Sequence, residues 1–423
     1  MVVVALSPVV WAPRWWNLAA MLLVPLFWLL RRRYTGSWSV HTPFDRPVLA
    51  LLIVLPLTLL PVVQWNEAGP RYLALLYGLA VVYATANAPR QTQPVDAVLF
   101  LFFGSSVLVT AVGLVGTDWL TDKAIGSMSL FDAVYSRLPT LTLGLRGTDR
   151  GGIHPNQLAG LICLLAPLGA ALAVSAPRWR RLTRLLLVLL VVLLLLTQSR
   201  SGFIGSTVGL AAVLGWWLVS EAPATARHRR SALWAILVLP VAGLAGWLVT
   251  VWTAPTTIGT LNTLPSRLEL WDRAIRMIGD YPVTGIGMGQ LPTVLTRLYP
   301  VFSLPLEYFV PHVHNFVLQL VLDLGIPGAS AMLAIFGTAF WSLRRTYQSA
   351  VDRPLRGAAV GLASGVTGFL VYGSTDAIVF GARGLLPLWL VLGTIAWLAC
   401  SRPEPAWDVV PRQTGSETRM RDK

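Results

Sequence analysis

The chain has 423 residues, of which 55% are hydrophobic and only 12% are charged, whereas soluble domains carry about 25% charged residues. The apolar residues come in runs such as LLLVLLVVLLLLTQ at 185–198, and about 20 apolar residues make one helix that crosses a bilayer. The composition therefore excludes a soluble globular protein and indicates an all-α polytopic membrane protein.

The net charge of the chain is +14. The distribution of the basic residues along the chain shows whether this charge indicates nucleic-acid binding or orientation in a membrane. The basic residues form short clusters between apolar runs, at 31–33, 178–181, 227–230 and 344–345. Short basic loops mark the cytoplasmic side of a membrane protein, whereas nucleic-acid binding needs a basic face with reading elements. We therefore expect no nucleic-acid partner, and we interpret the charge as setting the orientation in the membrane.

The apolar runs predict about eleven (10–12) transmembrane helices. They lie near residues 9–30, 47–65, 70–87, 94–116, 156–176, 185–199, 201–220, 232–252, 314–343, 357–376 and 384–400. The loops assigned to the cytoplasm hold most of the 33 lysines and arginines, which predicts an outer N-terminus and a cytoplasmic C-terminus. The first span precedes a basic cluster and has no small-residue cleavage site, so we expect it to be retained.

Two predicted outer loops, 117–155 and 253–313, are long, and loops held by a rigid scaffold often carry function. The first loop ends in GIHPNQLAG at 152–160. Asn156 follows Pro155 at the start of a span, where asparagine is a natural helix cap. The sequence leaves open whether Asn156 only caps that helix or also contributes to a site.

Arg200 lies in LLLLTQSRSGFIG at 193–205, between two predicted spans with almost no loop around it. A charged residue near hydrocarbon costs at least a few kcal/mol, so this arginine needs a partner or a lipid headgroup. The alternative is a turn residue exposed at the interface.

Residues 264–282, LPSRLELWDRAIRMIGDYP, predict an amphipathic helix in the second outer loop. Ser266 and Glu269 have the spacing of a capping box. Arg267 falls in the middle of the apolar arc and in the first helical turn, where the helix dipole disfavours a cation by about 0.3–1 kcal/mol. A bound anion would reverse that preference, because helix N-termini and arginine both attract phosphate. The alternative is an arginine that snorkels to the membrane interface.

Residues 311–328, PHVHNFVLQLVLDLGIPG, place polar side chains at the start of a predicted span. Asn315, Gln319 and Asp323 follow one another at intervals of four and form one polar stripe on a helix. His314 stands at the mouth of this helix, and a histidine can accept a proton from a hydroxyl near pH 7. The alternative is a histidine that caps the helix or lines a helix interface. No Asp-x-Asp or His/Glu cluster suggests a metal, so arginines would have to neutralise any pyrophosphate.

Four of these segments, in this order, carry a resemblance to a known family. They are LRGTDRGGIHPNQLAG, LLLLTQSRSGFIG, SRLELWDRAIRMIGDYPVTGIGMGQL and HNFVLQLVLDLGIPG. Over roughly residues 145–345 the chain resembles the O-antigen ligase and polymerase family of bacterial inner-membrane glycosyltransferases. The resemblance implies a membrane-embedded glycosyltransferase fold that needs no metal or other cofactor. It also implies transfer of a glycan from a polyprenyl-pyrophosphate-linked donor to an acceptor on the outer, periplasmic face of the cytoplasmic membrane.

The resemblance also implies roles for individual residues. His314 resembles the general base of the family, and Arg267 and Arg200 resemble the arginines that hold the lipid pyrophosphate. Possible supporting residues are Asn315, His312, Asn156 and Asp323. His312 could assist His314 or merely precede the helix, and Asp323 stands where the family often has glutamate. A single displacement by the acceptor hydroxyl would invert the anomeric carbon.

Hydropathy and the resemblance together suggest three regions: N-terminal transmembrane helices (1–140), a ligase-like core (141–400) that includes the outer loop 253–313 with its short helices, and a cytoplasmic tail (401–423). The tail is polar and contains prolines, so we expect it to be disordered. The sequence does not separate a ligase, which would use a lipid-core or protein acceptor, from a polymerase, which would use a saccharide. The main alternative is a transporter or flippase of a lipid-linked or anionic saccharide, which usually shows internal repeats and polar sites at the bilayer midplane. No such repeat is visible here. The expected partners are the lipid-linked donor, the acceptor and membrane lipids.

Overall fold

The computed structural model describes residues 28–117, 153–220, 264–305, 308–377 and 385–400, together with the single positions 26, 119 and 137. All named elements in these residues are helices, and the only extended pairing there is an isolated parallel bridge between Thr117 and Ile153. An all-α architecture is therefore confirmed for the described part of the chain.

In chain order the helices are α3 (Asp45–Val54), η2 (Leu55–Leu59), α4 (Trp65–Ala86), α5 (Pro94–Gly116), α7 (Pro155–Ser175), η3 (Pro177–Trp179), α8 (Arg180–Thr197), α9 (Arg200–Ser220), α11 (Leu264–Asp280), α12 (Leu291–Leu298), α13 (Phe316–Ser349), α14 (Arg353–Gly373) and α15 (Leu386–Cys400). Each predicted span that falls within the described residues coincides with one or more of these helices. The predicted spans at 9–30, except for its end, and 232–252 lie outside the described residues, as does the tail 401–423.

Five of the described helices are long and apolar enough to cross a membrane: α5, α7, α9, α13 and α14. This finding supports a multi-pass membrane protein. Helix α8 is more polar than these five, with three arginines in its first two turns, and helix α15 is shorter, with 15 residues. The total of about eleven spans and the long outer loop therefore stay predictions.

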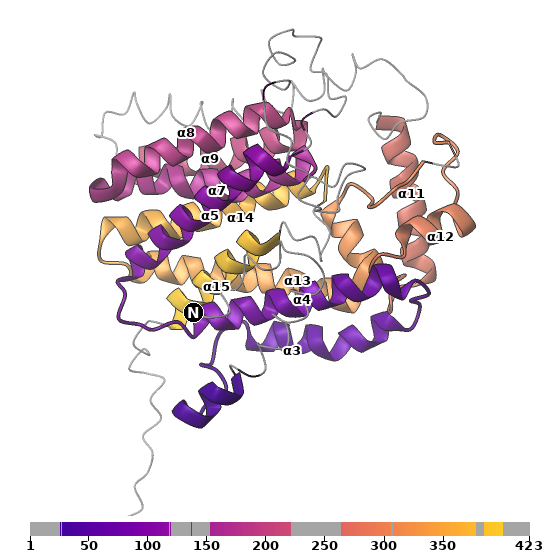
Figure 1. Ribbon diagram of the computed structural model, residues 1–423, viewed down its shortest axis with the longest axis horizontal. Coiled ribbons are helices and arrows are strands. Elements are labelled where there is room, and N and C mark those ends of the chain that lie inside the picture. Colours follow the sequence, from indigo (N-terminus) through magenta and orange to yellow (C-terminus); the bar gives the residue numbers. More distant parts are fainter. Residues whose placement is uncertain are drawn as a thin grey trace, which may run out of the picture.

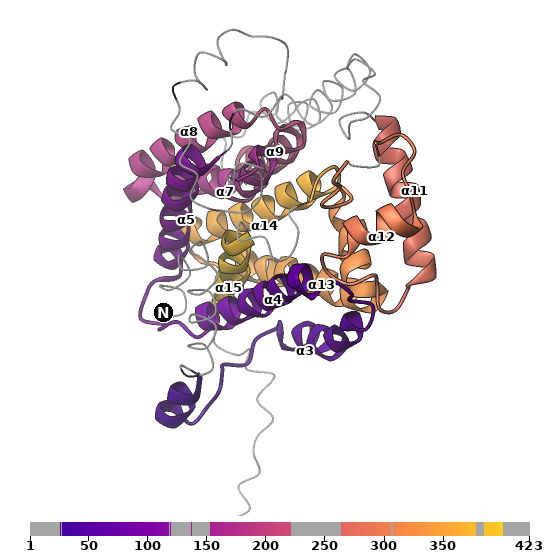
Figure 2. The same cartoon turned by 45° about the vertical axis from the view of Figure 1, so that its right-hand side comes forward.

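The helices form two groups on either side of α14 (Figures 1 and 2). Helices α5, α7, α8 and α9 lie on one side, helices α3, α4, α13 and α15 lie on the other, and α11 and α12 stand at one end. Helix α14 packs against α7, α9 and α13, and α11 packs against α13. The end of the bundle that carries α11 also carries the residues singled out in the sequence.

Glycines allow α7, α9 and α14 to approach closely. A Cβ atom at Gly365 would lie 2.1 Å from the Leu164 carbonyl oxygen, and one at Gly205 would lie 2.5 Å from the carbonyl oxygen of Gly368. Small residues at such contacts are typical of helix packing in membranes, where van der Waals contact replaces the hydrophobic effect as the driving force. This packing holds the N-terminal ends of α7 and α9 beside the end of α14.

Helix α13 is broken at Gly325, which has φ 66° and ψ 174°. The predicted span at 314–343 corresponds to a helix long and apolar enough to cross a membrane, but the chain leaves the helical conformation at Gly325, before Pro327. The loop that follows α11 bonds to the break: the Ile326 N–H donates to the Pro282 carbonyl at 2.8 Å, and the Ile286 N–H donates to the Leu322 carbonyl at 2.7 Å. The broken helix thus anchors the loop between α11 and α12.

That loop carries three closely spaced glycines, which the sequence shows as GIGMGQL. Gly285, Gly287 and Gly289 all have positive φ values, between 63° and 87°, a region that glycine adopts without steric cost. The Gln290 side chain then joins the loop to the start of α4, because its carbonyl accepts from the N–H groups of Val63 and Gln64 at 3.1 and 2.9 Å. The loop is therefore fixed on both sides.

We expect Gly325→Ala to destabilise the folded protein by about 1–3 kcal/mol. Gly325 has a positive φ, and its new Cβ atom would lie 2.0 Å from the Val283 carbonyl oxygen. Thermal unfolding of the purified protein in detergent measures the effect. Gly337→Ala in the same helix is the matched control, because a Cβ atom there meets nothing within 4 Å. Equal unfolding temperatures for the two variants would contradict the account of the break.

The amphipathic helix predicted at 264–282 is α11, and its contacts differ in detail from the prediction. Leu270, Ala274 and Met277 are fully buried, whereas Leu268 and Ile275 are more than half exposed, so the buried stripe is narrower than predicted. Arg267 lies three residues before Leu270 and extends this buried stripe, as the helical wheel predicted.

The predicted capping box of α11 is wrong. The helix begins at Leu264, so Ser266 lies inside it. The Glu269 carboxylate accepts instead from the backbone N–H groups of Phe302 and Ser303, at 2.8 and 2.9 Å. Glu269 therefore anchors the chain that leads back toward His314.

Candidate active site

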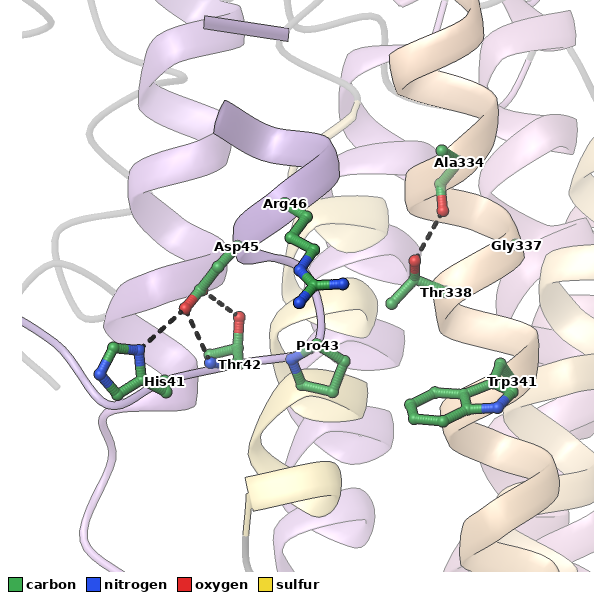
Figure 3. Close-up of a pocket in the computed structure, with 9 residues that line it drawn as sticks. All are labelled: His41, Thr42, Pro43, Asp45, Arg46, Ala334, Gly337, Thr338 and Trp341. Carbon is green, nitrogen blue, oxygen red and sulfur yellow. Dashed lines mark hydrogen bonds and ion pairs between the residues drawn. The ribbon is translucent and has the colours of Figure 1, made fainter. Parts of the chain in front are cut away.

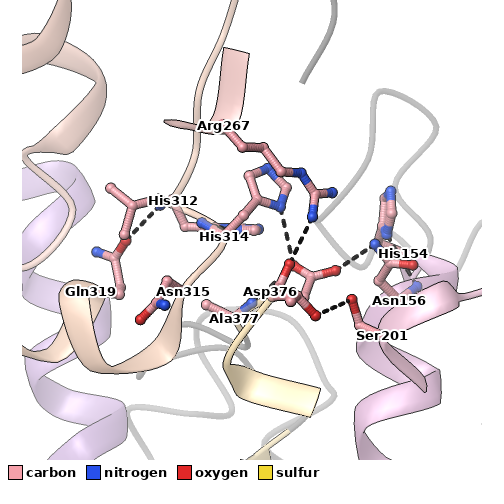
Figure 4. A network of polar contacts seen from close by, with 12 residues as sticks. His154, Asn156, Ser201, Arg267, His312, His314, Asn315, Gln319, Asp376 and Ala377 are labelled. Atoms are coloured by element: carbon pink, nitrogen blue, oxygen red, sulfur yellow. Dashed lines mark hydrogen bonds and ion pairs between the residues drawn. The ribbon is translucent and has the colours of Figure 1, made fainter. Parts of the chain in front are cut away.

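His314 faces the buried carboxylate of a residue that lies 62 positions later in the chain. Its Nδ1 atom lies 3.2 Å from Oδ1 of Asp376, which follows α14 (Figure 4). The second carboxylate oxygen of Asp376 accepts from the Asn156 side-chain amide at 2.5 Å, and Oδ1 also accepts from the Ala377 N–H at 2.8 Å. The Asp376 side chain is only 2% exposed and that of His314 is 15% exposed.

The two residues before Asp376 contact further helix ends. The Arg267 guanidinium donates to the Thr375 carbonyl through Nη1 at 2.9 Å, and the Thr375 hydroxyl donates to that of Ser201 at 2.8 Å. The Asn315 amide donates to the Ser374 carbonyl at 3.0 Å. The 374–376 segment therefore connects residues from the first turns or caps of α7, α9, α11 and α13.

The N-terminal ends of these four helices meet around one segment, which determines the local electrostatics. Each helix N-terminus carries partial positive charge and unpaired N–H groups. Arg200 and Arg267, in the first turns of α9 and α11, add full charges that are close enough to affect each other. An arrangement of this kind stabilises a bound anion, phosphate above all.

The backbone at His314 adopts a rare conformation. His314 has φ 51°, and among the described non-glycine residues only Gln198 shares a positive φ. Such a conformation costs roughly 1–3 kcal/mol and persists where the surroundings impose it. Here the His314 N–H donates to Nδ1 of His312 at 3.3 Å, and the Asn315 side chain caps α13 by accepting from the Leu318 N–H at 3.0 Å. This backbone conformation directs the His314 ring toward Asp376.

The second positive-φ residue shapes the turn that carries Arg200. Helix α8 ends at Thr197, and Gln198 takes the left-handed conformation, with φ 48°. The Ser199 hydroxyl then accepts from the Gly202 N–H at 3.2 Å, as a helix cap does. The tight turn places Arg200 as the first residue of α9 and sets Ser201 against the 374–376 segment.

Asp376 is ionised in this site. Burial would raise the pKa of the Asp376 carboxyl, but the hydrogen bond and charge of His314, with His312 and Arg267 nearby, lower it far below its usual range. An ionised carboxylate can only accept, so the Nδ1 atom of His314 carries the proton. In the neutral imidazole the Nε2 atom is then the acceptor, and it is the atom that a general base would use.

His312 is held in the neutral state beside His314. The two ring centroids lie 4.2 Å apart. Burial and the charge of His314 together lower the pKa of His312 to about 3. Since Nδ1 of His312 accepts from the His314 backbone, His312 orients the His314 backbone and is uncharged at neutral pH.

Asp323 lies away from the His314 site. It is fully buried and accepts from the Gln319 amide at 2.9 Å, while the Gln319 carbonyl accepts from the Val313 N–H at 3.0 Å. Arg71 of α4 is close enough to interact with its charge. Of the predicted polar stripe, only Asn315 contacts the site. Gln319 and Asp323 instead face the chain before His314 and the charge of Arg71 on α4.

The structure thus brings together most of the residues predicted from the sequence. His314, Asn315, Asn156 and Arg267 contact the 374–376 segment directly. Arg200 precedes Ser201, which also contacts it, the His312 ring lies tilted beside that of His314, and Asp323 is separate. Asn156 is not the helix cap, because His154 caps α7 by accepting from the Asn156 N–H at 3.2 Å. The Asn156 side-chain amide instead donates a hydrogen bond to the Asp376 carboxylate.

Sequence reasoning missed Asp376. The signal was available, since this carboxylate ends the predicted span at 357–376 on the side assigned to the outer face. A lone acidic residue beside hydrocarbon is costly and marks a functional or paired group. Only the spatial contact identifies its partner as His314.

His312, His314 and Asp376 also form the one group within the described residues whose composition could hold a metal ion, with ligand atoms within 4.8 Å of one another. Two imidazoles and a carboxylate are ligands that zinc and iron accept. The metal-free reaction expected from the sequence therefore stays a prediction.

Comparison with protein-family models supports the resemblance noted in the sequence. Residues 185–333 match the O-antigen ligase family, which confirms the resemblance over this part of the chain. The matched region contains Arg200, Arg267 and His314 but not Asn156 or Asp376. None of the curated proteins compared with the chain matches it.

Proposed function

We propose that the chain transfers a glycan from a polyprenyl-pyrophosphate-linked donor to a saccharide or lipid-core acceptor. Two findings lead to this proposal: the chain is a multi-pass membrane protein, and its residues 185–333 match the O-antigen ligase family. The observation that carries this proposal is the contact between His314 and the buried carboxylate of Asp376, with Arg267 on the adjacent residue. The general base and the anion site that such a transfer needs would then adjoin one another.

The proposed reaction begins with the acceptor hydroxyl. Its proton passes to Nε2 of His314 as the oxygen attacks the anomeric carbon of the donor, and general-base assistance of this kind contributes about 10²–10⁴-fold. Asp376 holds the Nδ1 proton and stabilises the imidazolium that forms. Attack from the face opposite the leaving group inverts the anomeric carbon.

The bond from the anomeric carbon to the pyrophosphate oxygen breaks in the same step, and polyprenyl pyrophosphate leaves with the bonding electrons. Its growing negative charge would be stabilised by Arg267 and Arg200 and by the helix N-termini around them. Because both arginines are charged at any relevant pH, this stabilisation would need no proton transfer. In this scheme no metal ion takes part.

The proposed location of the reaction is the outer face of the cytoplasmic membrane. The basic clusters at 178–181 and 344–345 lie at the opposite ends of α8 and α13 from Arg200 and His314. The positive-inside rule assigns those clusters to the cytoplasm, which puts His314 on the other side. A lipid-linked donor held in the outer leaflet would present its pyrophosphate at that level.

The test uses the purified full chain in detergent with a polyprenyl-pyrophosphate-linked oligosaccharide. Release of polyprenyl pyrophosphate is measured with and without candidate saccharide and lipid-core acceptors. Acceptor-dependent release supports the transferase, and the size of the product separates a polymerase from a ligase. Absence of release, combined with movement of the lipid-linked glycan across liposomes, would instead establish the transporter. An added EDTA arm should leave the rate unchanged, whereas loss of activity would assign a metal to His312, His314 and Asp376.

Arg267→Ala is expected to lower the transfer rate by about 10²–10³-fold, the effect typical of removing one donor that stabilises charge in a transition state. The matched control is Arg276→Ala on the same helix, because Arg276 is exposed and pairs only with Asp272 in the described residues. The rate of the control should stay within twofold of the wild type. Equal losses for both variants would point to damage of α11 rather than to a pyrophosphate site.

A further inference from the structure

A cavity lies between α3 and α13, on the second half of α13 and away from the His314 site (Figure 3). It begins about 20 residues beyond His314, or roughly 30 Å at 1.5 Å per helical residue. Its volume is about 710 Å³. One wall is the chain from His41 to Arg46, and the other is a face of α13 that includes Gly337, Thr338 and Trp341.

The cavity is open on the α13 side because Gly337 has no side chain. A Cβ atom at that position would meet nothing within 4 Å, so no neighbouring side chain fills the space. Helices α3 and α13 run antiparallel here, since the chain near Val54 approaches Gly328 while that near Arg46 faces Thr338. The opening is therefore a gap between two antiparallel helices.

Among the charged side chains that line the cavity, Arg46 is the one that could bind an anionic ligand. Asp45 is the lining carboxylate, and its oxygens accept from the Thr42 N–H and hydroxyl at 3.2 and 2.6 Å and from the Tyr83 hydroxyl at 2.9 Å. His41 adds a contact at 3.4 Å. Arg46 is exposed and points into the gap, and no hydrogen bond or ion pair engages it within the described residues (Figure 3).

A second cation lies against Trp341, which lines the cavity on the α13 side. The Arg345 guanidinium lies over the ring of Trp341, 4.6 Å from its centroid. Trp341 is 49% exposed, and tryptophan side chains favour the level of the lipid headgroups. The cavity thus combines an aromatic side chain suited to the membrane interface with a cation from the first turn of α3 and one from the second half of α13.

Apolar side chains continue from the cavity along both helices. Leu49 and Ile53 of α3 are 59% and 67% exposed, and Leu333 of α13 is 40% exposed. Arg46, Leu49 and Ile53 follow one another on one face of α3. An occupant with a phosphate at Arg46 and hydrocarbon beside Leu49 and Ile53 would match both halves of this surface.

From these contacts we propose that the cavity binds the headgroup of an anionic phospholipid, with the phosphate at Arg46 and the acyl chains along α3 and α13. This site is separate from the proposed transfer reaction and does not depend on it. Its position at the basic end of the bundle corresponds to the leaflet in which juxtamembrane arginines attract anionic lipids.

Native mass spectrometry of the delipidated full chain in detergent tests the proposal, with phosphatidylglycerol, phosphatidylcholine and glycerol 1-phosphate as probes. Phosphatidylglycerol should bind more tightly than the other two. Arg46→Gln should weaken its binding about fivefold, the effect of one arginine near a lipid surface. Gly337→Leu, which fills the cavity and keeps every charge, should weaken it at least as much.

Arg33→Gln is the matched control, because it removes an exposed arginine that does not line the cavity. Its phosphatidylglycerol binding should equal that of the wild type. Equal binding of phosphatidylcholine, or equal losses for all three variants, would overturn the proposal in favour of nonspecific lipid association. Equal binding of glycerol 1-phosphate would overturn it in favour of a free phosphate ester. Thermal unfolding shows whether Gly337→Leu folds, and Gly337→Ala gives a smaller substitution at the same site.

Discussion

Replacing His314 with alanine is expected to lower the rate of acceptor-dependent glycan transfer by about two to four orders of magnitude. Without the imidazole, the acceptor hydroxyl has no base positioned by Asp376, and only water can take its proton. Binding of the donor should change little, because Arg267 and Arg200 remain. The measurement is single-turnover release of polyprenyl pyrophosphate at saturating acceptor.

Two controls separate loss of the base from loss of the fold. The thermal unfolding temperature of His314→Ala should fall only modestly, because the buried Asp376 carboxylate loses its contact with His314 but keeps the hydrogen bonds from Asn156 and Ala377. Added imidazole should restore part of the activity. Full activity of His314→Ala would refute the proposed mechanism, and so would retention of configuration at the anomeric carbon.

Asp376→Asn is expected to have an effect of similar size, about 10³–10⁴-fold on kcat, by analogy with the loss of the orienting carboxylate from a catalytic triad. The asparagine amide can donate to Nδ1 of His314, which would place the imidazole proton on Nε2 and leave no base for the acceptor. The side chain keeps its shape, so KM for the donor should change little. Steady-state kinetics with varied donor concentration measures both constants.

Asp272→Asn serves as the matched control for this variant. Asp272 is an exposed carboxylate of α11 that pairs with Arg276, and surface ion pairs contribute about 0–1 kcal/mol. Its kinetics should match those of the wild type. An Asp376→Asn protein with wild-type kcat would show that Asp376 only supports the fold, and a rise in KM alone would assign it to donor binding.

The sequence by itself determined the class of the protein and most of the candidate site. Long apolar runs have no role in a soluble core, and a charged or polar residue beside hydrocarbon is costly enough to stand out. His314 and Arg200 were recognisable for that reason, since each lies at the edge of an apolar run, and Arg267 was recognisable because it falls in the apolar arc of an amphipathic helix. Hydropathy and helical periodicity are properties of neighbouring residues, so they can be read without a fold.

Only the tertiary structure decided which of these residues act on one another. The contact of His314 with Asp376 joins positions 62 residues apart, and that of Asn156 with Asp376 joins positions 220 residues apart. The break of α13 at Gly325 depends in the same way on a loop from another part of the chain. Contacts of this kind depend on how helices pack, which local periodicity does not encode. The alignment of four helix N-termini around one buried carboxylate could therefore not be predicted from the sequence.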